Sequence, residues 1–352
     1  MLQRILAHTG LALLTISLLS MGSCNTPDNK GNATDSTATA SKDSLTATDP
    51  LPSWNDGATK KALLNFVSAA TQTGGQSFIP ESDRIAVFDN DGTLWSEQPL
   101  YFQFFFAFDR IKQMAPQHPQ WKNQEPYKSL LNGNMKGVMA TGEKGLIALM
   151  ATTFAGMNSE EFNNQVSAWA DTAKNPVTGK RYIDMIFQPM LELLNLLRAN
   201  GFKTFIVSGG DIDFMRAWAG KVYGIPPPQV IGSSLKSSFA VKHDSVSIMR
   251  LPQMNFIDDG PGKPVGIYQH IGIKPVFAAG NSDGDYQMLQ WTYSNTLPHL
   301  GIIVHHTDSA REWKYDRGSP IGKLEKGLDD AGKYGWILVD MKNDWKKIFP
   351  YN

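Results

Sequence analysis

The chain has 352 residues, and its 33 lysine and arginine side chains are balanced by 33 aspartate and glutamate side chains. This length suggests about two domains, and a hydrophobic share of 41% is enough to bury a sizeable core. The zero net charge gives no support to nucleic-acid binding, which normally goes with a basic excess, so we expect no nucleic-acid partner. A phosphorylated small molecule stays possible because it needs only a local cationic site.

The first 23 residues are expected to be a signal peptide. Arg4 precedes the mostly apolar stretch ILAHTGLALLTISLL, which is too short and too interrupted for a membrane span. Small residues lead to Cys24, the only cysteine, in a pattern that resembles a bacterial lipoprotein signal. The alternative is an ordinary cleaved signal with an incidental cysteine. We expect an exported envelope protein that is lipid-modified at Cys24, faces the periplasm and touches the membrane through this anchor only.

Residues 24–53 are expected to form a flexible tether. They are rich in Thr, Ser, Asn, Asp and Ala and hold almost no large apolar side chains, so they bury too little surface to offset their ordering entropy. The folded part is expected to begin near Trp54. Because no other cysteine follows, the folded part has no internal disulfide and depends on its core.

Short apolar runs alternate with helix-like segments in the rest of the chain. The segments between the runs repeat apolar residues at helical spacing, as MLELLNLLRANG does. Strands that alternate with helices predict an α/β fold, a Rossmann-like, doubly wound parallel sheet covered on both faces. The predicted strands are 85–88, 204–207, 276–279, 301–304 and 336–339.

Residues 98–189 interrupt this alternation. They are mostly helical and aromatic in pattern, so we predict an inserted helical domain between two parts of the α/β core, 54–97 and 190–352. A shorter insertion, 239–256, has the pattern of a β-hairpin. The aromatic cluster that opens the helical insert is expected to form mainly its core and hinge, rather than the wall of a ligand site. The cluster comprises Tyr101, Phe102, Phe104, Phe105, Phe106 and Phe108.

Two carboxylates follow the first predicted strand. Asp89 and Asp91 stand in DNDGT, directly after the apolar run. Because sites in open parallel sheets lie beyond the carboxyl ends of the strands, both are expected at that edge. A lone aspartate there is usually a turn former or helix cap. Two together can also hold a hard cation such as Mg²⁺, or serve as nucleophile and proton donor.

The pattern DNDGT resembles the first motif, Asp-x-Asp-x-Thr, of the haloacid dehalogenase superfamily of phosphohydrolases. The resemblance implies that Asp89 attacks phosphorus to form an aspartyl-phosphate. It implies that Asp91 protonates the leaving alcohol, then deprotonates the hydrolytic water, and offers its main-chain carbonyl to Mg²⁺. Thr93 is assigned to phosphate binding on the same basis.

Two further motifs follow in the family's order. In FIVSGG, Ser208 stands at a strand tip, where its hydroxyl and the following N–H groups, that of Gly209 included, are expected to bind phosphoryl oxygens. The third motif is a lysine that neutralises charge on the nucleophile and the phosphoryl group. We predict Lys263, at a helix start in GPGKPVG, over Lys274, which enters a strand at the end away from the site.

The fourth motif is an acidic loop, present here as GNSDGD over 280–285. Asp285 matches the second acid of the family pattern, but Asn281 occupies the position of the first. An amide oxygen can ligate Mg²⁺ without adding charge, so this departure predicts weaker metal binding unless Asp283 or Asp285 compensates. The predicted cofactor is Mg²⁺, and its predicted ligands are Asp89, Asp91, Asn281 and Asp285.

Asp91 narrows the expected reaction. Dehalogenases of the superfamily lack the second aspartate, and its transport ATPases carry threonine there. The resemblance therefore implies a phosphatase that hydrolyses a small phosphorylated metabolite, a phosphomonoester, with residues 98–189 as a cap over the site. The position of the insert and the stretch YGIPPPQVIG resemble the phosphoserine-phosphatase branch. Two alternatives stay open, a phosphotransferase or mutase and a non-catalytic envelope lipoprotein that uses the fold as a binding module.

Three other ionisable residues are candidates for the site. His305 and His306 follow a predicted strand, but no second His or Cys cluster accompanies them, so we expect a surface turn rather than a metal site. Glu97 is close enough in sequence to Asp89 to contact a substrate amine, although such a glutamate is more often solvated.

Overall fold

The computed structural model describes residues 49–243 and 245–351. The predicted signal peptide, Cys24 and most of the predicted tether lie outside the described residues. The described fold begins before the expected start at Trp54. Leu51 is fully buried, and the main-chain N–H of Ser53 donates to Glu192 Oε2 over 2.9 Å. These contacts hold residues 49–53 against the domain, which the polar composition of the segment did not indicate.

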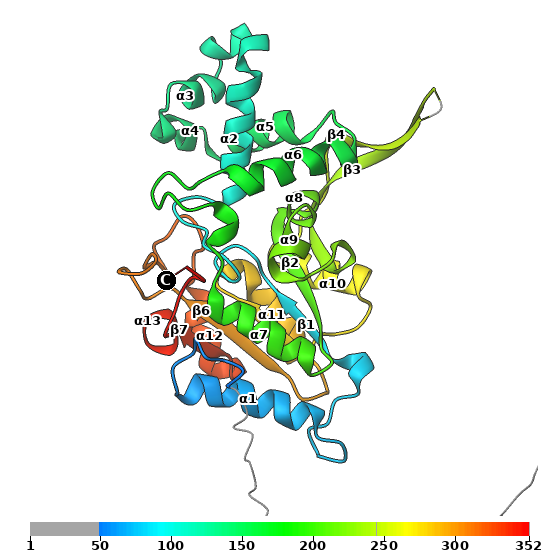
Figure 1. The fold of residues 1–352 in the computed structure, drawn as a ribbon, viewed down its shortest axis with the longest axis vertical. Helices are drawn as coiled ribbons and strands as arrows, with labels where there is room; N and C mark the ends of the chain where they lie inside the picture. Colours follow the sequence, from blue (N-terminus) through cyan, green and yellow to red (C-terminus); the bar gives the residue numbers. More distant parts are fainter. Residues whose placement is uncertain (1–48, 244, 352) are drawn as a thin grey trace, which may run out of the picture. The chain divides into compact units, whose positions relative to one another are not determined.

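Seven strands form one sheet in the order β4-β3-β2-β1-β5-β6-β7 (Figure 1). Neighbouring strands are parallel except β3 and β4, which pair in antiparallel fashion. The predicted Rossmann-like α/β fold is confirmed, with an antiparallel strand added at one edge. The strands are β1 Ile85–Phe88, β2 Lys203–Asp211, β3 Val230–Lys242, β4 Ser245–Phe256, β5 Phe277–Gly280, β6 Leu300–His305 and β7 Ile337–Asp340.

Helices cover both faces of the sheet because each central strand is apolar on both sides. In β1, Ala86 and Phe88 belong to one hydrophobic cluster, whereas Ile85 and Val87 belong to another on the opposite face. The first face packs against α1 (Ala58–Thr71), α7 (Gln188–Ala199), α8 (Ile212–Arg216) and α9 (Ala219–Tyr223). The second packs against α10 (Gly262–His270), α11 (Tyr286–Tyr293) and α12 (Lys326–Tyr334), and a short α13 (Met341–Asp344) follows β7.

The segment between β1 and β2 is helical, as predicted. Apart from α7, which packs on the sheet, its helices are grouped together beyond the sheet in Figure 1, and Ile111, Val138 and Leu149 are buried in a hydrophobic cluster that this segment largely forms itself. The exact domain boundaries at 98 and 189 remain predictions. The helices are α2 Phe102–Met114, α3 Tyr127–Leu131, α4 Met135–Ala140, α5 Gly142–Phe154 and α6 Ser159–Thr172.

The predicted hairpin is present, but its first strand starts nine residues earlier, at Val230 instead of 239. The first part of β3, Val230–Ser233, pairs with β2 in the core sheet, and the later part pairs with β4. One long strand therefore serves both the core and the hairpin. The sequence did not indicate this because the core part is a short apolar run directly after a proline-rich turn.

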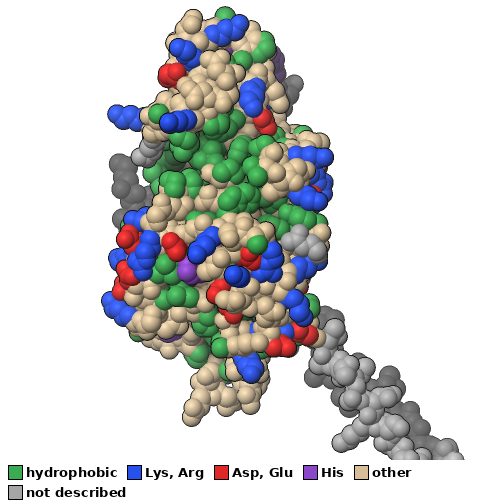
Figure 2. Space-filling model, turned by 90° about the vertical axis from the view of Figure 1, so that its left-hand side faces the viewer, with side chains coloured by type: hydrophobic (Ala, Val, Ile, Leu, Met, Phe, Trp, Pro, Cys, Tyr) green, Lys and Arg blue, Asp and Glu red, His purple; other side chains and the backbone are tan. Residues whose placement is uncertain are grey.

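The surface carries charges of both signs. On the face drawn in Figure 2, Lys and Arg side chains are interspersed with Asp and Glu, and hydrophobic side chains gather across the middle. Within residues 49–243 and 245–351, no helix combines the length and the apolar character needed to span a membrane.

Candidate active site

Asp89, predicted as the nucleophile, lies at the carboxyl end of β1. Its main-chain N–H donates to the carbonyl of Ala279 in β5 over 2.9 Å, which ties this position to the neighbouring strand. Its side chain is buried, and Oδ1 accepts a hydrogen bond of 2.6 Å from Lys263 Nζ. The carboxylate is thus held at the strand tip with a cation on one oxygen.

Lys263 bridges the strand tips from the first turn of α10. Its ammonium also donates to Asp285 Oδ1 over 2.5 Å and to the carbonyl of Val207 over 2.9 Å, so all three N–H groups have acceptors. Burial alone would lower the pKa of Lys263, but the carboxylates of Asp285 and Asp89 outweigh burial and raise it. The lysine is therefore a permanent cation at the site. Lys274, the rejected alternative, instead donates to Ser294 at the surface.

Asp91 lies in the turn that follows β1. Gly92 allows this turn, because it has a φ of +74° and a Cβ there would meet the side chain of Asn281 at 2.0 Å. The indole N–H of Trp95 donates to Asp91 Oδ1 over 2.8 Å and fixes the carboxyl group. Burial raises the pKa of Asp91 to about 6, against the opposing effects of the Trp95 hydrogen bond and the Lys263 charge. The group can therefore both hold and release a proton near neutral pH.

Ser208 is placed by an irregularity in β2. The register between β2 and β3 shifts between Ser208 and Asp211, and the two glycines of FIVSGG occupy the shift. The buried Ser208 hydroxyl accepts a hydrogen bond from the N–H of Gly210 over 3.1 Å. The N–H of Asp211 donates to Gln103 Oε1 over 3.0 Å, which links this turn to α2.

The acidic loop after β5 is organised by Asp285. Its Oδ2 accepts the N–H groups of Asn281 (2.9 Å) and Ser282 (3.1 Å), while Oδ1 receives Lys263. The carboxylate is fully buried and faces its own loop and the lysine. The sequence predicts that Asp285 is a direct metal ligand. Its geometry fits better with a residue that positions Lys263.

Asn281 and Glu97 form a buried polar pair beside the turn of Asp91. The Asn281 amide donates to Glu97 Oε1 over 2.7 Å, and its Oδ1 accepts from the Thr93 hydroxyl over 3.3 Å. The hydroxyl of Tyr315 also donates to Glu97 Oε1, over 2.7 Å. Burial, together with the charges of Asp91 and Asp89, raises the pKa of Glu97 well above its usual range, against the opposing hydrogen bonds from Tyr315 and Asn281. A carboxyl group therefore lies next to the amide that replaces the family's first loop acid.

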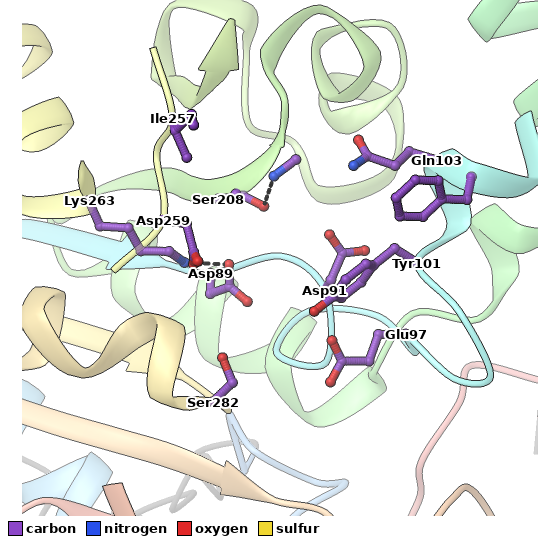
Figure 3. A pocket seen from close by; sticks show the side chains of 13 residues that line it. Asp89, Asp91, Glu97, Tyr101, Gln103, Ser208, Ile257, Asp259, Lys263 and Ser282 are labelled. Carbon is purple, nitrogen blue, oxygen red and sulfur yellow. Dashed lines mark hydrogen bonds and ion pairs between the residues drawn. The ribbon is translucent and has the colours of Figure 1, made fainter. Parts of the chain in front are cut away.

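These side chains surround a cavity of about 280 Å³. Figure 3 shows the carboxyl groups of Asp89, Asp91 and Glu97 directed into it, with Ser208 and Gln103 along another side. The predicted residues that line it are Asp89, Asp91, Ser208, Gly209 and Lys263, whereas Thr93, Asn281 and Asp285 lie behind the lining.

The family assignment rests on a sequence match that covers these elements. The model of the haloacid dehalogenase-like hydrolases matches residues 86–290, which is more than half of the chain. The chain belongs to the haloacid dehalogenase-like hydrolase family. It is therefore a hydrolase.

Solved structures that are similar to this hydrolase have low sequence identity to it. A protein of unknown function from Anaerococcus prevotii is 19% identical, with 72% of this chain and 86% of the other covered and a TM-score of 0.47. One from Bordetella pertussis is 14% identical, with coverage of 73% and 98% and a TM-score of 0.45. A phosphoserine phosphohydrolase-like protein from Francisella tularensis is 14% identical, with coverage of 71% and 98% and a TM-score of 0.35. The curated proteins include no match. Family membership therefore rests on the family model.

Several residues that line the cavity of this hydrolase were not predicted from the sequence. Asp259 comes from the loop between β4 and α10, and burial raises its pKa. The stretch DDGPGK, with two acids shortly before Lys263, was a signal that could have identified it. Of the aromatic cluster, Phe102, Phe106 and Phe108 are buried in the core as expected, but Tyr101 and Phe104 line the cavity. Gln103, Gly210, Ile257 and Ser282 were also missed.

The expectation of a surface turn at His305 and His306 is wrong for His306. Its imidazole is buried, donates from Nε2 to the carbonyl of Gly92 over 2.7 Å, and lies 3.0 Å from Glu312 Oε2 through Nδ1. Through the Gly92 carbonyl, His306 therefore supports the turn that carries Asp91. The fold brings the two segments together across more than two hundred residues, a contact that no local pattern could indicate.

Proposed function

We propose that this hydrolase is a magnesium-dependent phosphatase that cleaves a small phosphomonoester through an aspartyl-phosphate at Asp89. The proposal is carried by one arrangement, in which Asp89 with Lys263 on one oxygen shares a cavity with Asp91. A carboxylate next to a fixed cation can attack phosphorus. A second carboxyl group with a pKa of about 6 can donate and accept a proton.

In the first step of the proposed reaction, a carboxylate oxygen of Asp89 forms a bond to phosphorus while the ester P–O bond breaks. Asp91 gives its proton to the departing alkoxide oxygen, so an alcohol leaves. Lys263 offsets the negative charge that spreads over the phosphoryl oxygens, and the Ser208 hydroxyl and the N–H of Gly209 are assigned to bind those oxygens.

In the second step, Asp91 removes a proton from water. The resulting hydroxide oxygen bonds to phosphorus, and the bond between phosphorus and Asp89 breaks. Inorganic phosphate leaves, Asp89 is an anion again and Asp91 is protonated again. The sum is one ester and one water converted into one alcohol and one phosphate.

The cavity's donor set fits Mg²⁺. Carboxylates of Asp89, Asp91, Glu97 and Asp259 line it, and the described lining contains Lys263 as its cation, already paired with Asp89 and Asp285. Oxygen donors with excess negative charge suit this hard ion. In the described part of the chain no three His, Cys, Asp or Glu side chains form a metal cluster by themselves.

We assign Mg²⁺ to Asp89, the main-chain carbonyl of Asp91 and Asn281. When bound, the ion supplies Lewis-acid stabilisation of the phosphoryl oxygens. Asp285 acts through Lys263, and Thr93 through its hydrogen bond to Asn281. Glu97 places a further carboxyl group next to Asn281 and accepts a hydrogen bond from its amide.

The decisive experiment measures phosphate release from p-nitrophenyl phosphate by the purified mature protein, with Mg²⁺ and with EDTA. We expect release that EDTA abolishes, and a loss of at least about a thousandfold in Asp89→Asn, because the nucleophile is removed. Asp329→Asn is the matched control, since this exposed aspartate on α12 pairs with Arg317 at the surface.

The same assay separates the alternative functions. Equal, negligible release by the wild type and Asp89→Asn would favour the non-catalytic binding module. Transfer of the phosphoryl group to an added alcohol in preference to water would favour a phosphotransferase or mutase.

The proposed setting is the bacterial envelope, where such an enzyme would release phosphate from esters outside the cytoplasm. This part of the proposal is supported by the residues before Cys24 and by the tether composition. Radiolabelled lipid incorporation that is lost in Cys24→Ser would be the expected result for the anchor.

A further inference from the structure

An apolar groove adjoins the active-site cavity. It has a volume of about 290 Å³ and lies between α5 and the β3–β4 hairpin. It shares four lining residues with the cavity, namely Gln103, Phe104, Gly209 and Ile257. The two spaces therefore adjoin each other at these residues, which places the groove next to a ligand bound at Asp89.

The groove exposes large apolar side chains that the fold alone does not need at the surface. Ile147 of α5 is 50% exposed, Met254 of β4 is 46% exposed and Ile257 is 60% exposed. Leaving such side chains in water forgoes the free energy of burial, and a concave apolar site next to a few polar groups is typical of a binding site.

The polar groups along the groove already have partners within the protein. Asp211 Oδ2 accepts from Arg250 Nη2 over 2.8 Å, and both side chains are buried. The hydroxyl of Ser233 accepts the N–H of Asp258 over 2.9 Å, and that of Ser234 accepts the Asn255 amide over 3.1 Å. What the groove offers a ligand is therefore mainly hydrocarbon contact.

The groove opens on the side of the cavity where the leaving group is expected. Asp91, the proposed proton donor, and Gln103, which lines both spaces, flank Gly210. A Cβ placed on Gly210 would lie 3.7 Å from Asp91 Oδ2 and 3.4 Å from Gln103 Oε1. Figure 3 shows Gln103 and Ile257 on the same side of the cavity as Ser208, across from Ser282.

We propose that the groove binds the organic part of the substrate and that the substrate is a phosphomonoester of an apolar alcohol. The inference rests on the proposed phosphatase function. With the phosphoryl group at Asp89, the ester oxygen lies within reach of Asp91 and the hydrocarbon enters the groove beneath α5. Hydrolysis then releases phosphate and a hydrophobic alcohol.

The test uses n-alkyl phosphates from ethyl to octyl, below their micelle-forming concentrations, together with the matching non-hydrolysable alkylphosphonates. In the full mature protein, we expect kcat/KM to rise about two- to fourfold for each added methylene until the groove is filled. Octylphosphonate should bind at least tenfold more tightly than ethylphosphonate in calorimetry. Equal affinity for the two phosphonates overturns the inference.

Two variants connect this preference to the groove. Ile147→Asp places a charge on the groove wall and should reduce the octyl-to-ethyl ratio of affinities at least fivefold. Val177→Asp is the matched control, because Val177 is 67% exposed and does not line the groove, and it should keep the wild-type ratio. Circular dichroism with thermal unfolding establishes that both variants fold. An unchanged ratio in Ile147→Asp overturns the inference.

Two further results distinguish this inference from the phosphatase proposal and from the formation of a dimer through the groove. If no ester is hydrolysed but octylphosphonate still binds more tightly than ethylphosphonate, and Ile147→Asp removes the difference, the phosphatase proposal fails while the groove assignment stands. If sedimentation shows a dimer that Ile147→Asp dissociates, a second copy of the chain covers the groove and the inference is wrong.

Discussion

The active-site region has a floor of buried charged side chains and a roof of exposed apolar side chains. The floor consists of Asp89, Lys263 and Asp285 at the strand tips, all buried and joined by hydrogen bonds of 2.5–2.6 Å. The roof consists of apolar side chains from α5 and the hairpin, such as Ile147 and Met254, which are about half exposed.

We expect the floor to carry out the reaction and the roof to select the substrate. Buried charges are tolerated only with close partners, so the floor has one arrangement in which its groups are satisfied. Exposed apolar side chains need no such partners, so other side chains can replace them without loss of the fold. We therefore expect floor substitutions to affect stability and every substrate, and roof substitutions to affect the choice among substrates.

The largest expected effect comes from removing the cation of the floor. Lys263→Ala leaves the carboxylates of Asp89 and Asp285 buried without their partner, which should lower the free energy of unfolding by about 3–5 kcal/mol. Urea-induced unfolding at pH 7 measures the change. Lys274→Ala is the matched control, because this lysine contacts Ser294 at the surface and should change stability by less than about 1 kcal/mol. Similar losses in both variants would contradict the description of the floor.

A smaller effect, which depends on the substrate, is expected on kcat/KM when Asp91 is replaced. Asp91→Asn removes the proton donor, which should lower kcat/KM for alkyl phosphates about a hundredfold. p-Nitrophenyl phosphate should lose much less, because its leaving group needs little protonation. The ratio kcat/KM is the right quantity, since it reports steps up to formation of the phosphoenzyme. Equal losses on the two esters would count against proton donation by Asp91.

The smallest effect concerns the pH dependence of stability. Burial raises the pKa of Asp258 to about 7, above the value of 3.8 for an unperturbed aspartate. The folded protein thus holds this proton up to about pH 7, and the stability it contributes is lost as the pH rises through that value. Asp258→Asn should therefore reduce the fall in unfolding free energy between pH 5 and pH 7 by about 2 kcal/mol. Asp329→Asn is again the control, and an unchanged pH profile in Asp258→Asn would show that Asp258 is not the group responsible.

Much of the fold was accessible from the sequence. The predicted strands all occur in the sheet with ends that differ by a few residues, because apolar runs bounded by turns report burial on both faces. The helical insert and the hairpin were also recognised. The start of β3 at Val230 and the packing of Leu51 were not, since a short apolar run beside prolines and a single leucine in a polar stretch carry weak local signals.

The site was predicted in part. Asp89, Asp91, Ser208 and Lys263 line one cavity, consistent with their positions at strand tips and at a helix start. Their chemical roles remain proposals. The sequence indicates a substrate contact or a solvated residue at Glu97, whereas the structure buries it against Asn281, 184 residues further along the chain.

The sequence by itself determined which chemical groups stand at the ends of the central strands, because strand periodicity and the residues after each strand are local properties of the chain. Only the tertiary structure decided that Lys263 joins Asp89 to Asp285, that His306 supports the turn of Asp91, and that α5 and the hairpin enclose an apolar groove. These are contacts between distant segments, and their geometry depends on how the helices and the sheet pack.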